Sequence, residues 1–149
     1  MSTTAARLQK IMYTAEATAT GGREAGHVTT SDGRLEVDLS APAEMGGDGG
    51  PGTNPEQLFA AGLAGCFQSA LMSVARRQGL SADDSTVTSR VSIGPIGDGR
   101  YGLSVDLLVR LPSIADRSKA EDLLAQAEQR CPYSNAIRGS VELSTTVVA

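Results

Sequence analysis

The chain has 149 residues and a mass of 15.3 kDa, the size of one domain, so residues 1–149 are predicted to form a single domain. Hydrophobic residues make up 40% and charged residues 20%, a balance that favours a globular protein over a disordered chain. The formal net charge is −4, and aromatic residues make up 3% with no tryptophan. Without a basic face or aromatic platforms, nucleic acid is not expected as a partner.

The first ten residues contain no apolar run that could form the core of a secretion signal, so a cytoplasmic location is expected. The two cysteines, Cys66 and Cys131, are too few for a disulfide-built secreted scaffold of this length. In a reducing compartment, a pair of thiols is more often catalytic, redox-active or metal-binding than structural. Zinc requires about four ligands, and with a single histidine, His27, the sequence predicts no metal site.

The N-terminal third is predicted to be an antiparallel meander. Residues 11–18 and 27–39 contain β-branched residues and the period-two alternation of strands. Gly21-Gly22-Arg23 interrupts the first run, and Ser31-Asp32-Gly33 is typical of a tight hairpin turn. Residues 42–53 are glycine-rich and are expected to form a loop or an active-site lid. A phosphate-binding loop would need a Gly-Lys-Ser/Thr ending, which is absent.

A long helix is predicted from Thr53-Asn54-Pro55-Glu56, where a cap, a proline and an acid occur together, to about Gln78, where Gly79 can end it. Residues 57–75 carry no charge, which is also typical of a membrane span. Polar and small residues interrupt the segment, which favours a helix that is buried on all sides and closely packed against another helix or a partner subunit. No membrane association is expected.

The rest of the chain predicts a second hairpin, an amphipathic helix and a final strand. The strands are expected over 86–93 and 100–111, the helix over 116–130, and the last strand over 141–148. The order of elements therefore predicts one α+β domain.

The two cysteines lie 65 residues apart and do not form a Cys-x-x-Cys pair. Cys66, in the middle of the long helix, is either a small core residue or a reactive thiol. Cys131 is either a buried cap residue or a reactive thiol, because residues 132–136 could begin another helical turn whose positive end faces its sulfur. Nothing near either cysteine supports a Cys–His hydrolase.

Several motifs together resemble the organic hydroperoxide resistance proteins of the OsmC superfamily. The residues that carry the resemblance are Thr53 to Gly62 leading to Cys66-Phe67, Cys131-Pro132-Tyr133-Ser134-Asn135-Ala136, Arg138-Gly139, and Thr20-Gly21-Gly22-Arg23. The resemblance covers nearly the whole chain. Leu63 stands where Tyr is common, Gly65 where Ala is common, and Ala25 lengthens the turn after Arg23.

The resemblance implies an OsmC-like α+β fold, with antiparallel sheets wrapped around a central buried helix in an intertwined homodimer. It also implies a thiol-dependent peroxidase that reduces organic hydroperoxides, including those of fatty acids. Cys66 would be the peroxidatic and Cys131 the resolving cysteine, with no bound cofactor and with lipoyl dithiols carried on proteins as the reductant.

The same resemblance assigns Arg23 to support the Cys66 thiolate and Glu56 to orient Arg23. This agrees with the chemistry, since the thiolate is the nucleophile and apolar surroundings raise the pKa of a cysteine. A guanidinium can bind a carboxylate with two donors and still present others to sulfur and peroxide oxygen.

Glu56 and Cys66 are ten residues apart, about 15 Å along a straight helix. An Arg23 that bridges both would have to reach too far. Either the helix breaks near Gly62 or Gly65, or Glu56 acts in the site of the other subunit, and the second alternative is preferred.

Apolar residues near Cys66 are expected either to line a substrate pocket or to belong to the core, namely Phe59, Leu63, Phe67, Leu71 and Met72. The rival functions are a non-enzymatic domain switched by a Cys66–Cys131 disulfide and an OsmC-like peroxidase with a different peroxide preference.

Overall fold

The structure is a computed structural model that describes residues 5–149. It consists of two compact units, residues 1–54 and residues 55–149, of which the first is described from residue 5. The chain as a whole mixes helix and strand, as the sequence predicted, whereas the short helices of the first unit were not predicted. A division of the chain into separate domains is not implied by these units, and the single domain stays a prediction.

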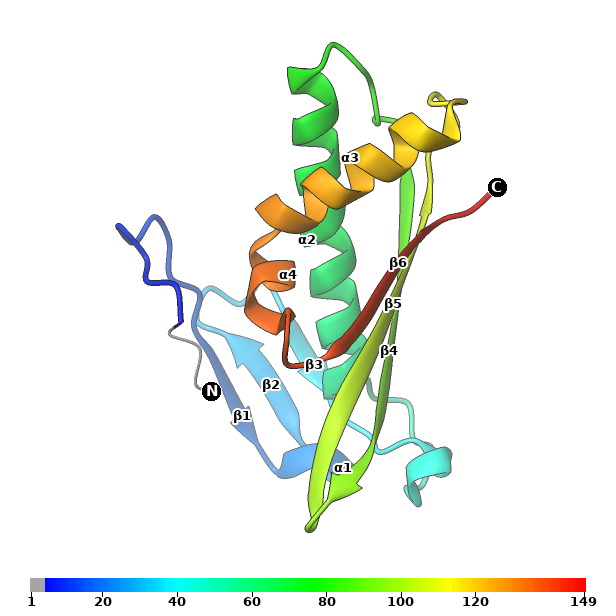
Figure 1. The fold of residues 1–149 in the computed structure, drawn as a ribbon. Coiled ribbons are helices and arrows are strands. Elements are labelled where there is room, and N and C mark those ends of the chain that lie inside the picture. The colour runs from blue at the N-terminus through cyan, green and yellow to red at the C-terminus, as the bar shows by residue number, and fades with distance from the viewer. Residues whose placement is uncertain (1–4) are drawn as a thin grey trace. The chain divides into compact units, whose positions relative to one another are not determined.

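The N-terminal unit is a three-stranded antiparallel sheet followed by a loop. Its elements are β1 (Ala17–Thr20), α1 (Gly22–Ala25), β2 (His27–Thr30), β3 (Glu36–Asp38) and the 3₁₀ helix η1 (Ala43–Met45), and the strand order is β1-β2-β3 (Figure 1). Asp32 at the β2–β3 turn accepts hydrogen bonds from the Thr30 hydroxyl at 2.8 Å and the Arg34 N–H at 3.0 Å. Gly33 has φ 73°, as the predicted hairpin turn requires.

The strand predicted over residues 11–18 is wrong for its first six residues. The strand begins at Ala17, which pairs with Thr30, the last residue of β2. Beyond Thr30 the chain enters the hairpin turn and offers no further strand residues to pair with. Leu8, Ile11, Met12 and Tyr13 are all more than 70% exposed.

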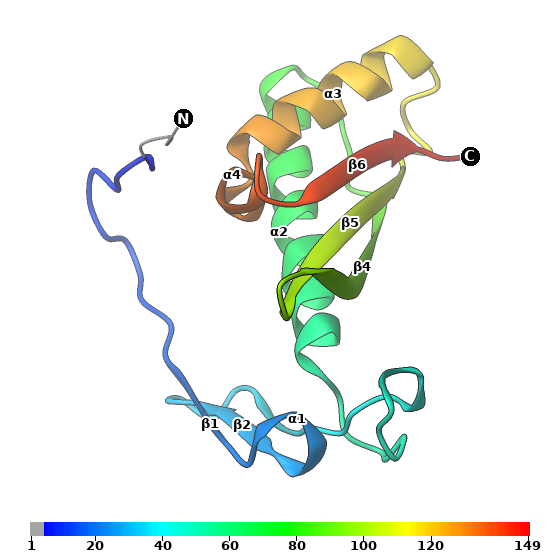
Figure 2. The same ribbon diagram turned by 60° about the horizontal axis from the view of Figure 1, so that its bottom comes forward.

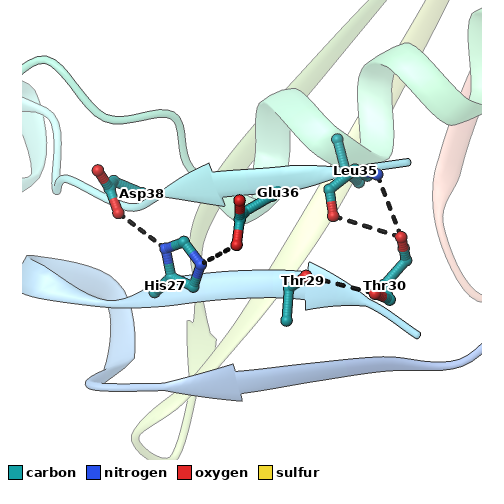
Figure 3. Close-up of polar contacts among 6 residues, drawn as sticks. All are labelled: His27, Thr29, Thr30, Leu35, Glu36 and Asp38. Atoms are coloured by element: carbon teal, nitrogen blue, oxygen red, sulfur yellow. Dashed lines mark hydrogen bonds and ion pairs between the residues drawn. The ribbon is translucent and has the colours of Figure 1, made fainter. Parts of the chain in front are cut away.

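Polar side chains cross-link β2 and β3 on the surface of this sheet. Figure 3 shows His27 between two carboxylates of β3, with its Nδ1 2.8 Å from Asp38 Oδ1 and its Nε2 3.3 Å from Glu36 Oε2. Both hydrogen bonds raise the pKa of His27, that to Asp38 more than that to Glu36.

The C-terminal unit contains the long helix and a second sheet. Its elements are α2 (Pro55–Arg77), β4 (Thr86–Gly97), β5 (Arg100–Arg110), α3 (Arg117–Arg130), α4 (Pro132–Ile137) and β6 (Glu142–Val147). α3 crosses α2 and α4 lies beside it (Figure 1). The predicted end of α2 and the predicted start of α3 are confirmed to within one residue. Leu80 N–H donates to Ala75 O around Gly79, and the Asp116 side chain accepts from the Lys119 N–H.

β5 is the central strand of this sheet, whose order is β4-β5-β6. β4 pairs with it antiparallel, as predicted from the hairpin, whereas β6 pairs with it parallel. The parallel pairing follows from the connection, since the chain between β5 and β6 crosses over through α3 and α4 (Figure 2). The expectation of purely antiparallel sheets is therefore wrong at β6, while the α+β class is confirmed.

The core lies between α2, the sheet and α3. Its largest fully buried side chains include Leu63, Phe67, Leu71, Leu107 and Leu123. By length and composition α2 could cross a membrane, but core helices of soluble proteins pass the same test, and α2 packs against β4 and α3.

In the single chain, α2 is not buried on all sides, in contrast to the prediction from its uncharged sequence. Gln57, Ala61, Gly65 and Ser69 are exposed, at a spacing of four residues that places them on one uncharged face. The fold therefore buries one side of α2 and leaves the opposite side at the surface.

Candidate functional site

The structure brings the two cysteines together. The Cys131 thiol donates a hydrogen bond to the Cys66 sulfur, with the two Sγ atoms 3.4 Å apart. Both are free thiols, Cys131 fully buried and Cys66 partly exposed. A disulfide requires a sulfur–sulfur distance of about 2.05 Å, so a movement of little more than an ångström separates the thiol pair from a bond.

Cys131 occupies the joint between two helices, where it is the C-terminal cap of α3 and the N-terminal cap of α4. Its side chain makes no cap hydrogen bond to α4, because the thiol is directed to Cys66. Cys131 is thus the buried cap residue of the first alternative, and its role as a reactive thiol stays a prediction.

The first turn of α4 provides a donor to the other sulfur. The backbone N–H of Tyr133 hydrogen bonds to the Cys66 thiol, which lowers its pKa. Burial is the larger effect and raises the pKa of Cys66. The sequence predicted a helical turn after Cys131, but the N–H that it presents serves Cys66 from α2.

A network of polar groups fastens α4 to the end of α3. Arg138 Nη2 donates to Glu128 O at 2.8 Å and Nη1 to Asn135 Oδ1 at 2.7 Å, while Asn135 Nδ2 donates to Gln129 O at 3.0 Å. These bonds satisfy carbonyls at the end of α3 that have no partner within the helix. The network thereby fixes the joint that carries Cys131.

An aromatic pair lies beside the thiols. The Phe59 and Tyr133 rings meet edge to face with centroids 6.1 Å apart, and the Tyr133 ring also lies against Gly62 of α2. Of the predicted pocket residues, Leu63 and Phe67 are fully buried in the core, and Leu71 is too. Phe59 and Met72 are partly exposed at the edge of that core. A pocket role for Phe59, Leu63 and Phe67 stays a prediction.

The other two predicted site residues lie in different units. Arg23 belongs to α1 in the N-terminal unit, and Glu56 is the second residue of α2 in the C-terminal unit. α2 runs unbroken from Pro55 to Arg77. A helix break near Gly62 or Gly65 is therefore ruled out as the way to bring Glu56 to Cys66, and the alternative that it acts in the other subunit's site stays a prediction.

Within residues 5–149, no group of three His, Cys, Asp or Glu side chains is arranged to hold a metal ion. The two acids near His27 lie at opposite ring nitrogens and so do not converge on one ion. The sulfur pair is the candidate site, and its chemistry is that of thiols.

Sequence reasoning did not find the contact between Gly62 and Tyr133 or the Tyr133 N–H at Cys66. The signal for the first was present in the sequence, because a glycine inside a helix is unfavourable by about 1 kcal/mol relative to alanine and so suggests a packing reason. The second depends on the crossing of α2 by the α3–α4 joint, which no local pattern encodes.

Comparison with known proteins places these features in a family. Residues 46–146 match the family described as OsmC-like protein. An organic hydroperoxide resistance protein of Xanthomonas axonopodis pv. citri is 46% identical over 140 residues, covering 93% of this chain and 96% of that protein. The organic hydroperoxide resistance protein OhrB of Bacillus subtilis is 44% identical, covering 89% and 95%.

A solved structure agrees with the sequence relatives. The crystal structure of an organic hydroperoxide resistance protein from Legionella pneumophila is 46% identical and superimposes with a TM-score of 0.88, covering 94% of this chain and 100% of that one. The OsmC-like fold expected from the motifs is therefore confirmed.

Proposed function

Because this chain belongs to the OsmC-like protein family, in its organic hydroperoxide resistance branch, we propose that it is a thiol-dependent peroxidase that reduces organic hydroperoxides to alcohols. The observation that carries the proposal is the pair of free thiols whose sulfurs lie 3.4 Å apart in the buried joint of α2, α3 and α4. A peroxidase of this kind needs one thiol to attack and a second within reach to form a disulfide.

In the proposed reaction, the Cys66 thiolate attacks the outer oxygen of ROOH and the O–O bond breaks. The alkoxide leaves with a proton as the alcohol, and Cys66 becomes a sulfenic acid. Cys131 then attacks the Cys66 sulfur, water leaves, and a disulfide forms. An external dithiol reduces this disulfide by exchange and is itself oxidised. Cys66 suits the first role because it is partly exposed, and Cys131 the second because it is fully buried.

Arg23 and Glu56 are proposed to make the Cys66 thiolate available. Burial raises the pKa of Cys66, and the single N–H of Tyr133 opposes it, so a cation has a clear task there. Arg23 is assigned that task, with Glu56 holding the guanidinium in place.

A homodimer is proposed as the active form, with Glu56 acting in the site of the other subunit. The exposed, uncharged face of α2 supports this, since its small residues permit close packing of a second chain. The unbroken α2, which separates Glu56 from Cys66 by about 15 Å, supports it as well. A monomer in gel filtration with full activity would refute the dimer.

Organic hydroperoxides, including those of fatty acids, are the proposed substrates, because apolar side chains surround Cys66. Bulky organic hydroperoxides should therefore be consumed faster than hydrogen peroxide. Equal efficiency on the two would favour an OsmC-like peroxidase of different preference.

The proposed reductant is a lipoylated protein or another carrier of lipoyl dithiols, and the proposed location is the cytoplasm. No bound cofactor enters the proposal, since the two thiols supply both electrons for each cycle.

The deciding experiment follows hydroperoxide consumption by wild type, Cys66→Ser and Cys131→Ser with dihydrolipoamide or, in parallel, a monothiol. Wild type should turn over many equivalents with the dithiol, and Cys66→Ser should be inactive. Oxidation of one equivalent per chain with no turnover would instead indicate a redox-switched domain. Equal inactivity of all three proteins would show that the fold is present without the peroxidase activity.

A further inference from the structure

Gly62 lies one helical turn before Cys66 in α2 and touches the chain that follows Cys131. A Cβ atom at this position would lie 2.9 Å from Tyr133 Oη, 3.2 Å from Cε2 and 3.3 Å from Cζ. The first distance is shorter than real Cβ contacts, so the ring would have to move. The glycine, unfavourable in a helix interior, is thus explained by the ring that lies on it.

Gly65 offers a direct contrast within the same helix. A Cβ added there would meet nothing within 4 Å, and the residue is exposed. Two glycines three residues apart therefore have the same backbone preference and different surroundings, which separates the effect of contact from that of helix propensity.

The Tyr133 ring and its backbone N–H are parts of one residue, so the position of one constrains the other. The hydroxyl end of the ring lies against Gly62, the ring packs edge to face with Phe59, and the N–H hydrogen bonds to the Cys66 sulfur. The far end of α4 is fastened by Asn135 and Arg138. Because the far end of α4 is fastened, we expect a displaced ring to shift the first turn of α4, which carries the N–H.

We propose that Gly62 is a positioning residue for the thiol chemistry: by lacking a side chain, it lets the Tyr133 ring lie directly on α2, and this holds the Tyr133 backbone N–H against the Cys66 sulfur. The proposal deepens the peroxidase function and rests on it for its biological meaning. The quantity that it predicts, the pKa of the Cys66 thiol, can be measured without peroxide.

The test measures alkylation of Cys66 by iodoacetamide as a function of pH, in full-length Cys131→Ser protein so that Cys66 is the sole thiol. Into this background Gly62→Ala and, as the matched control, Gly65→Ala are introduced. The midpoint of the pH profile reports the pKa of Cys66, and the plateau at high pH reports access of the reagent.

Gly62→Ala is expected to move the midpoint to higher pH and to slow alkylation at pH 7 about fivefold, the effect of losing one hydrogen bond. Gly65→Ala should leave the midpoint unchanged, and because Gly65 also lies on the face proposed to pack against a second chain, gel filtration of both variants checks that assembly is the same. Adding Tyr133→Phe to Gly62→Ala should recover part of the loss, since it removes the Oη atom that makes the tightest contact. The proposal is overturned if Gly62→Ala changes only the plateau, if both alanine variants behave alike, or if Tyr133→Phe recovers nothing.

If Gly62→Ala does not fold, Tyr133→Ala tests the same coupling from the other side, with Tyr101→Ala, an exposed tyrosine of β5, as its control. Tyr133→Ala should raise the midpoint, and an unchanged midpoint would overturn the proposal. Failure of wild type to consume hydroperoxide would refute the proposed function alone, because the midpoints would still decide the role of Gly62.

Discussion

The two units of the chain are stabilised by different means. In the C-terminal unit, apolar side chains of α2, β5 and α3 form a core in which Phe67, Leu107 and Leu123 are fully buried. In the N-terminal unit, the described residues include two buried apolar side chains, Leu39 and Ala41, and none on β1, β2 or β3. Its sheet is held by backbone pairing and by polar contacts such as those of His27.

This difference in packing assigns the positioning of the sulfurs to one unit and the supply of the proposed cation to the other. The unit with a core holds both sulfurs at a fixed distance, while the unit without one carries Arg23, the proposed cation. A three-stranded sheet without a buried apolar face is marginally stable by itself in water. Changes in the N-terminal unit are therefore expected to leave the distance between the two sulfurs unchanged but to alter the reactivity of Cys66.

Leu123→Ala is expected to have the largest effect on stability, because Leu123 is fully buried in the core of the C-terminal unit. Truncation of a buried leucine costs about 2–5 kcal/mol. Urea unfolding of the reduced protein measures this loss. Leu35→Ala, at a 40% exposed leucine of the N-terminal unit, is the control, with an expected loss below about 1 kcal/mol. Equal losses would show that the two units do not differ as described.

Arg23→Gln tests whether a residue of the N-terminal unit controls the reactivity of Cys66 in the C-terminal unit. If Arg23 supports the Cys66 thiolate, its loss should raise the pKa of Cys66 and slow alkylation at pH 7 about tenfold or more, since a nearby opposite charge shifts a pKa by about 1–3 units. Hydroperoxide consumption should fall in parallel, with urea unfolding little changed.

Arg34→Gln is the matched control for Arg23, because Arg34 lies in the same unit and is paired at the surface with Asp32 at 3.7 Å. It should leave the alkylation rate unchanged. An Arg23→Gln protein that alkylates like Arg34→Gln would remove Arg23 from the site.

Arg138→Gln should have a smaller effect, confined to the joint that carries Cys131. The substitution removes donors to Glu128 O and Asn135 Oδ1, an expected loss of about 1 kcal/mol in urea unfolding. Alkylation of Cys131 in a Cys66→Ser background should also become faster as the joint loosens. Arg76→Gln, which breaks an exposed pair with Asp83, is the control and should change neither. Unaltered Cys131 alkylation in Arg138→Gln would show that the network does not fix the joint.

The sequence predicted the C-terminal unit better than the N-terminal unit, for a physical reason. α2 and α3 have local start and stop signals, Pro55 and Gly79 for the first and Asp116 for the second, and the structure follows them. The strand expected over residues 11–18 has a suitable pattern, but whether it pairs depends on where β2 ends. Residues 11–16 therefore have strand character in sequence and belong to no strand within residues 5–149.

For the site, the motifs indicated both cysteines, but their separation could not be derived from the sequence. The 3.4 Å distance results from the crossing of α2 by the α3–α4 joint, which is a property of tertiary packing. The parallel pairing of β6 was missed for a similar reason, since a strand pattern is the same in either direction.

The smallest predicted effect concerns the polar contacts that substitute for a core in the N-terminal sheet. His27 is the single histidine, so its imidazole NMR signal can be followed with pH without assignment. It should titrate above the ordinary value of 6.5, because protonation strengthens its hydrogen bonds to Asp38 and Glu36. Asp38→Asn should lower this pKa more than Glu36→Gln, as Asp38 accepts the shorter bond, at 2.8 Å against 3.3 Å.

The sign of the linkage follows from the raised pKa. The stabilisation from His27 is fully present below the unfolded pKa near 6.5 and is lost as pH rises through the higher folded pKa. Wild type should therefore gain thermal stability over His27→Gln at pH 5.5 and lose that advantage at pH 8.5. Because the cluster is exposed, the gain should be smaller than the other effects and should shrink in high salt. A histidine that titrates at 6.5, or a stability difference that is the same at both pH values, would mean that backbone pairing alone holds β2 and β3 together, and the contrast between the two units would then rest on the core of the C-terminal unit alone.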